Sequence, residues 1–106
     1  MTSPKAMVRH IVLVKFRSDA PDALRQELIE RSQWSRKADY VSNYVCGHGV
    51  QPNPYPAQPD EWDWGMSLDM AREDVERYRD DPTHGAIPQE VIAAAEKFAI
   101  LDFIIE

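Results

Sequence analysis

The sequence of 106 residues has little of the material that disulfide, zinc or membrane chemistry requires. It holds one cysteine, Cys46, which excludes a disulfide within the chain and a cysteine-anchored zinc site, and we expect its side chain to be buried. No apolar run approaches the roughly 20 residues of a membrane-spanning helix, and residues 1–7 are too short and polar for a signal peptide. We therefore expect a cytoplasmic protein with no membrane partner and no bound metal.

Positive charge is also scarce. Twelve Lys and Arg residues stand against 18 Asp and Glu residues, which gives a net charge of -6. This balance repels phosphate backbones, so we expect no nucleic-acid partner. The length is that of one domain of about 100 to 150 residues, and we expect residues 1–106 to form a single domain.

Hydrophobic periodicity predicts four strands and three helices. The strands are expected over 8–16, 40–46, 62–70 and 98–105, and the helices from the start signal at 18–21 to about 37, over 73–80 and over 87–97. The order β, α, β, β, α, α, β is the split βαβ arrangement of the α+β ferredoxin-like fold. The expected architecture is one four-stranded antiparallel sheet with all helices on one side.

The first and last strands are apolar on both faces. Ile11 and Leu13 alternate with Val12 and Val14, and residues 98–105 are apolar apart from a single aspartate. Such strands need cover on both sides, so we expect both to lie centrally in the sheet. The helices cover one face only, and a second copy of the sheet is the simplest cover for the other. We therefore predict a homodimer, with the two sheets forming a dimeric α/β barrel.

Four prolines punctuate the segment 51–61, at positions 52, 54, 56 and 59. Prolines at this spacing remove ladder donors and favour extended backbone, which predicts a loop or arm. Its length leaves three alternatives, namely a plain surface loop, a cover over a functional site, or an arm that embraces a second subunit.

Three histidines come first in a search for acid–base chemistry, because their ordinary pKa lies near neutrality. His10 shares a strand face with apolar residues, and His84 lies in a turn between two helices with Tyr78 upstream. His48 stands between glycines at a strand end, where we expect it to be exposed. The sequence has no HExxH motif, no glycine-flanked serine after a strand and no phosphate loop. The functions that remain for these residues are proton transfer without a metal and simple ligand binding.

Three segments together resemble the stress-responsive α/β-barrel (Dabb) family of dimeric ferredoxin-like proteins. They are VRHIVLVKF around His10, VERYRDDPTHGAI with Tyr78 and His84, and the closing ILDFII. The proline segment is longer and richer in proline than is usual in the family. The resemblance covers nearly the whole chain in element order and implies the same dimeric fold.

The family includes polyketide cyclases that form olivetolic acid by aldol chemistry without metal or cofactor. The resemblance implies that His84 and Tyr78 are the catalytic pair, that His10 is a further catalytic histidine of the pocket, and that no cofactor is used. Trp64 stands at or near the position of another pocket histidine of those cyclases. Other members of the family are described only as stress-responsive.

Removal of a proton beside a carbonyl needs a near-neutral base and a hydrogen-bond donor for the enolate, and a histidine with a tyrosine supplies both. The side chains expected to form the apolar substrate-binding pocket are Phe16, Trp34, Trp64, Val12 and Met66. We predict a cofactor-independent cyclase, dehydratase or isomerase that acts on a small hydrophobic, polyketide-like or aromatic carbonyl compound. The alternatives are a non-catalytic stress-responsive or small-ligand-binding dimer, and a monooxygenase on the same fold.

Overall fold

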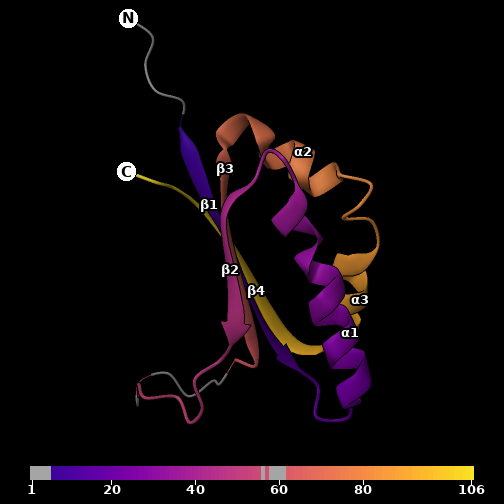
Figure 1. Ribbon diagram of the computed structural model, residues 1–106. Coiled ribbons are helices and arrows are strands. Elements are labelled where there is room, and N and C mark those ends of the chain that lie inside the picture. The colour runs from indigo at the N-terminus through magenta and orange to yellow at the C-terminus, as the bar shows by residue number, and fades with distance from the viewer. Residues whose placement is uncertain (1–5, 56, 58–61) are drawn as a thin grey trace, which may run out of the picture.

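The computed structural model describes residues 6–55, 57 and 62–106 (Figure 1). The element order is the predicted one. The elements are β1 (Met7–Phe16), α1 (Asp22–Ser32), the 3-10 helix η1 (Gln33–Lys37), β2 (Ser42–His48), β3 (Trp64–Ala71), the 3-10 helix η2 (Arg72–Asp74), α2 (Val75–Asp80), α3 (Ile87–Ala94) and β4 (Ala95–Ile104). No helix among the described residues is long and apolar enough to cross a membrane.

The four strands form one antiparallel sheet in the order β2-β3-β1-β4. All the helices of the described residues lie against one face of this sheet, and none of them lies on the other face (Figure 1). The predicted α+β ferredoxin-like fold with a four-stranded antiparallel sheet is therefore confirmed. In the register, His10 of β1 stands opposite Leu68 of β3 and Asp102 of β4. This row of side chains faces the helices.

The prediction that the last strand lies centrally is wrong, because β4 is an edge strand. It pairs with β1 alone, whereas β1 has β3 on its other side. The apolar side chains of β4 are correspondingly uncovered, with Ile100 and Leu101 each 56% exposed and Phe103 40% exposed. The apolar side chains on both faces of β4 thus indicate that it can pack against apolar surfaces on both sides. They do not indicate whether the strand is central or at the edge of the sheet.

Several element boundaries differ from the predicted ones. The helix expected to reach 97 ends at Ala94, because β4 continues its pairing with β1 as far as Ala95 opposite Phe16. The first helix changes to 3-10 geometry at Gln33. The third strand begins at Trp64 and leaves Trp62 half-buried outside it. Residues 51–55 and 57 of the proline segment form no helix or strand, and residues 56 and 58–61 lie outside the described part of the chain.

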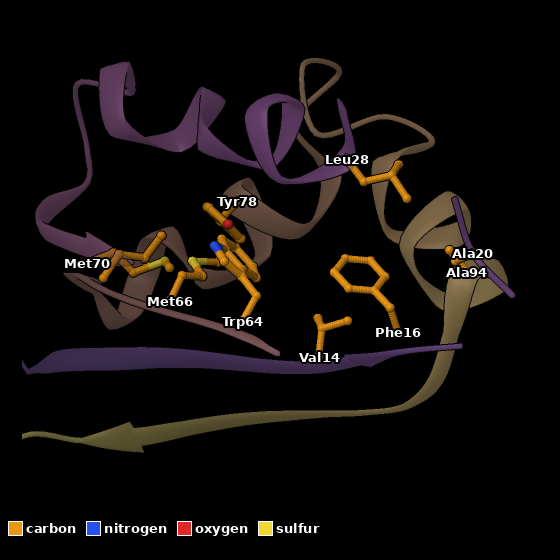
Figure 2. Packing of buried hydrophobic residues seen from close by; sticks show 10 residues of the cluster. Val14, Phe16, Ala20, Leu28, Trp64, Met66, Met70, Tyr78 and Ala94 are labelled. Carbon is orange, nitrogen blue, oxygen red and sulfur yellow. The ribbon is translucent and has the colours of Figure 1, made fainter. Parts of the chain in front are cut away.

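The core lies between the sheet and the helices (Figure 2). Val14 and Leu68 from the strands are 0% exposed, and Leu28 of α1 is 1% exposed. Full burial of side chains of this size stabilises a fold by about 1.5 to 3 kcal/mol each. Figure 2 shows Tyr78 from α2 lying over Trp64 of β3, between Met70 on one side and Phe16 on the other. This aromatic pair borders the candidate site.

Candidate active site

Four aromatic rings from four separate segments meet around Tyr78. His10 comes from β1, Trp34 from η1, Tyr78 from α2, and His84 from the turn between α2 and α3. The ring centroid of Tyr78 lies 5.1 Å from that of His10, 5.0 Å from that of His84 and 5.3 Å from that of Trp34. The Trp34 and Tyr78 rings are stacked, with 22° between their planes. The sequence-predicted residues His10, Tyr78 and His84 are thus neighbours in space.

Hydrogen bonds to Asp81 fix the turn that carries His84. The carbonyl of Asp81 accepts the backbone N–H of His84 at 2.9 Å, and its carboxylate accepts the backbone N–H of Thr83 at 2.9 Å. The hydroxyl of Tyr40 donates to the same carboxylate at 2.7 Å and, with Thr83, lowers the pKa of Asp81. Gly85 then adopts a φ of +47°, which an L side chain would strain. These hydrogen bonds hold the turn, and with it His84, in one defined conformation.

Both site histidines have Nδ1 engaged. Nδ1 of His10 lies 2.5 Å from Oδ1 of Asp102, which stands directly opposite on β4. Nδ1 of His84 donates to the carbonyl oxygen of Arg79 over 3.3 Å. A neutral imidazole that donates from Nδ1 keeps its lone pair on Nε2. Each ring therefore offers Nε2 as its basic nitrogen.

The sequence analysis did not identify Asp102 as a site residue. Its signal was present, since Asp102 is the one carboxylate in the apolar range 98–105 that the sequence predicts as the last strand. The register of β4 against β1 places that carboxylate beside His10, which is 9% exposed. A base whose ring is held by a carboxylate is a recurring catalytic arrangement.

Tyr78 is buried, with 4% exposure, and this burial raises its pKa to about 12. At neutral pH the phenol therefore keeps its proton. A protonated hydroxyl next to two histidine rings is a hydrogen-bond donor, which suits stabilisation of an oxygen on which negative charge develops.

The rings border a cavity of about 100 Å³ between the sheet and the helices. Its lining is mostly apolar and comprises His10, Val12, Val14, Ser32, Trp34, Trp64, Met66, Tyr78, His84, Ile87, Pro88, Val91, Ile92, Phe98 and Ile100. Phe98 and Ile92 are each 43% exposed, so the cavity opens between β4 and α3. The volume suits a small compound or one ring of a larger one.

Four of the five predicted pocket residues line this cavity, namely Val12, Trp34, Trp64 and Met66. Phe16 does not. It lies at the end of β1, where its ring packs against the guanidinium of Arg25 and borders a separate cavity of about 320 Å³.

The two remaining residues that the sequence analysis considered lie outside the ring cluster. His48 is exposed, as predicted, and borders the same separate cavity as Phe16. Cys46 is half-buried and not fully buried, with its sulfur 3.7 Å from Nη2 of Arg36. Within residues 6–55, 57 and 62–106, no group of three potential ligands is placed to hold a metal ion.

No family model and no curated protein matches the sequence, whereas solved structures match the fold over almost the whole chain. The hydroxynitrile lyase from Passiflora edulis is 20% identical, with 97% of this chain and 96% of that chain covered and a TM-score of 0.78. A dimeric ferredoxin-like protein of unknown function from Thermobifida fusca is 19% identical over 99% and 96%, with a TM-score of 0.76.

A Dabb family protein with a ferredoxin-like fold from Mesorhizobium loti is 18% identical over 96% and 99% of the two chains, with a TM-score of 0.73. At these low identities, the TM-scores establish a shared fold and no shared activity. The chain therefore has the Dabb-type ferredoxin-like fold that its sequence resembles.

Proposed function

We propose that this protein is a cofactor-independent lyase or isomerase that acts by proton transfer on a small hydrophobic carbonyl compound, either polyketide-like or aromatic. The observation that carries the proposal is the cluster of His10, Tyr78 and His84 at one cavity, with ring centroids about 5 Å apart and both Nδ1 atoms engaged. A protonated phenol between two rings with free Nε2 atoms provides an acid and a base together.

The proposed reaction needs only these side chains. Nε2 of His84 takes a proton from the carbon beside the carbonyl, the electron pair of that C–H bond forms a carbon–carbon double bond, and the π pair of the carbonyl moves to its oxygen. The Tyr78 hydroxyl donates a hydrogen bond to this oxygen as the enolate forms. In a cyclisation the enolate carbon then bonds to a second carbonyl carbon, and protonated His84 returns its proton to the new alkoxide. His10, held by Asp102, is a second proton carrier at the same cavity.

The hydroxynitrile lyase among the structural neighbours supports a lyase on this fold. Release of cyanide from a hydroxynitrile leaves a carbonyl group and requires a base for the hydroxyl proton. Aromatic cyanohydrins therefore belong beside β-polyketones in the set of substrates to be tested.

We also propose that the protein is a homodimer that packs through the helix-free face of the sheet. Val45, Leu101 and Phe103 lie exposed on this face, at 62%, 56% and 40%. An apolar area of this kind is unusual on a monomer. Two neighbours are described as dimeric proteins with this fold, from Thermobifida fusca and Bacteroides fragilis.

Turnover of β-polyketones and of mandelonitrile by the purified protein tests the proposed activity. His84→Ala should lower kcat by about 10²- to 10⁴-fold, the usual contribution of general acid–base catalysis, at an unchanged melting temperature. His48→Ala is the matched control, because His48 is exposed and outside the cavity, and it should leave kcat unchanged. Binding of aromatic ligands without any turnover would instead establish a non-catalytic binding protein, and substrate-dependent oxygen uptake would establish a monooxygenase.

A further inference from the structure

Trp34 borders two separate hollows of the protein. One is the candidate cavity of about 100 Å³. The other, here called the outer groove, has a volume of about 930 Å³ and is lined by residues of η1 and by Tyr40, Arg77, Asp81 and Thr83. Of the residues that line the two hollows, Trp34 is the one that they share. At this point the cavity and the groove are therefore one residue apart.

The indole ring of Trp34 lies against the rings of the candidate site. It stacks on Tyr78 with 5.3 Å between the centroids, and its centroid lies 5.5 Å from that of His84. Tyr78 and His84 line the candidate cavity and not the outer groove. Their neighbours in the sequence, Arg77 and Thr83, line the outer groove and not the cavity. The indole ring thus stands at the boundary between the two hollows.

Trp34 closes the candidate cavity on the side away from its mouth. The mouth lies at β4, which is one edge of the sheet. Trp34 belongs to η1, which packs against β2 at the other edge, where the guanidinium of Arg36 lies 4.6 Å from the ring centroid of Tyr44. A planar compound that enters at β4 therefore meets the indole ring as the far wall of the cavity.

The outer groove offers a surface that suits a further aromatic ring. The guanidinium of Arg77 lies 3.9 Å from the ring centroid of Tyr40, and Arg77 also pairs with Asp39 at 3.4 Å. Guanidinium and phenol planes are surfaces on which aromatic rings stack. The groove beyond the wall thus has the chemistry for a second ring of a fused aromatic compound.

We propose that Trp34 determines the size of the substrate, because its indole ring confines the occupant of the candidate cavity to a single ring. A shorter side chain at this position would join the cavity to the outer groove and admit a fused two-ring compound. This inference deepens the proposed function and rests on it for turnover. The size limit itself concerns binding and holds whether or not a reaction follows.

Binding of two ketones that differ by one fused ring tests the size limit. Acetophenone and 2-acetonaphthone carry the same enolisable acetyl group, and NMR titration of the amide signals gives their dissociation constants. The wild type should bind acetophenone about 10-fold more tightly, since the second ring meets the indole wall. Trp34→Ala should reverse this preference, and bound 2-acetonaphthone should then shift the amide signals of Tyr40 and Thr83. Trp34→Phe, which keeps a smaller ring, should give an intermediate ratio.

Trp62→Ala is the matched control for these variants. Trp62 is half-buried, as Trp34 is, but lines neither the candidate cavity nor the outer groove. Its replacement should leave both dissociation constants unchanged. The same ratio of constants in the wild type and in both folded Trp34 variants would overturn the proposal. A failure of both ketones to bind to the wild type and to Trp34→Ala would overturn it as well.

Kinetics extend the test to catalysis with mandelonitrile and its naphthyl analogue. Trp34→Ala should raise the ratio of kcat/KM for the naphthyl compound to that for mandelonitrile about 10-fold. Loss of the stacking on Tyr78 lowers the turnover of both compounds and cancels in the ratio, so a merely structural role would not change it. A reversed binding preference in a protein with no turnover would retain the size limit and reject the enzymatic function alone. Turnover with an unchanged ratio would reject the size limit alone.

Discussion

At the scale of single residues, the candidate site is defined by which nitrogen or oxygen holds a proton. Asp102 forms a hydrogen bond with Nδ1 of His10, and the carbonyl of Arg79 accepts one from Nδ1 of His84. Burial keeps the phenol of Tyr78 protonated. Asp102 is far from His10 in sequence, and Arg79 acts on His84 through its backbone, so neither partner is visible as a motif. The two histidines supply the reactive groups. Asp102 and the carbonyl of Arg79 determine which ring nitrogen carries the proton.

We predict that the carboxylate of Asp102 matters for both activity and stability. Asp102→Asn keeps an oxygen that accepts from His10 Nδ1 but removes the negative charge that strengthens this hydrogen bond, so kcat should fall about 10-fold with little change in KM. Asp102→Ala leaves a buried N–H unpaired and should lower the free energy of unfolding by about 1 to 3 kcal/mol. Steady-state kinetics and urea unfolding measure the two effects.

Glu96→Gln is the matched control for this pair of variants. Glu96 also lies on β4, but its carboxylate is exposed and pairs with Lys15 at 3.6 Å. It should leave kcat and the unfolding free energy nearly unchanged. Equal effects of Asp102→Asn and Glu96→Gln on kcat would contradict a role for the His10–Asp102 pair.

We also predict that stability falls in alkaline solution because of buried phenols. The pKa of Tyr78 is raised to about 12 in the folded protein, while the unfolded chain titrates near the ordinary value of 10.0. Between these two values the unfolded state loses its proton first, so the free energy of unfolding must decrease as pH rises from about 10 towards 12. Tyr40 and Tyr44 have raised pKa values for the same main reason, burial, and act in the same direction.

Urea unfolding at a series of pH values between 9 and about 11 measures this dependence. Tyr78→Phe should make the decline shallower, because one of the three contributing phenols is removed. Tyr55→Phe is the control, since Tyr55 is 68% exposed. A decline of the same steepness in Tyr78→Phe and in the wild type would show that the Tyr78 phenol is not held protonated by the fold.

At the scale of elements, the sequence predicted the order of strands and helices because each carries a clear period of apolar residues. It predicted the meeting of His10 with Tyr78 and His84 only through the resemblance to a known family. The place of β4 at the edge could not be read from its composition, because an apolar strand beside a cavity and a bare sheet face looks like a central strand. Phe16 was expected in the pocket for a related reason. The alternation of side chains along a strand indicates which face of the sheet a residue lies on, but not which cavity along that face it borders.

The end of α1 shows a further limit of periodicity. Apolar spacing continues from Leu28 to Trp34, so the sequence predicts one helix, whereas the structure tightens to 3-10 geometry at Gln33. That change of pitch brings Trp34 onto the Tyr78 ring and buries Ser35. The local departure from the predicted helix thus lies at the candidate site itself.

The described part of the proline segment argues against a cover over the candidate site, which was one of the three alternatives left by the sequence. Gln51 borders the separate cavity beside α1, and Figure 1 shows the loop extending from the end of β2 away from the helices. The candidate cavity lies between the sheet and those helices. Residues 51–55 therefore do not cover the cavity of their own chain, and a surface loop or a contact with a second copy remains.

At the scale of the whole molecule, the sheet has one face with helices and one without, and the second face is largely apolar. It carries the ion pair of Arg9 and Asp69, in which Arg9 donates twice to Asp69, at 2.8 and 3.0 Å, and Asn43 donates to the same carboxylate at 2.8 Å. Such a pair can be enclosed without leaving an unpaired charge. The chemistry of the face is thus compatible with burial against another sheet.

We predict that the protein is a dimer in solution and that a charge on this face separates the subunits. Light scattering at micromolar concentration should give a mass of twice 12.2 kDa. Leu101→Glu places a carboxylate on the proposed interface, where burial without a partner is costly, and should give the monomer mass. Leu24→Glu is the control, because Leu24 is 38% exposed on α1, on the helical side of the molecule, and should leave the dimer intact. A wild-type mass of 12.2 kDa, or dissociation by Leu24→Glu and not by Leu101→Glu, would show that the helix-free face is not where two copies meet.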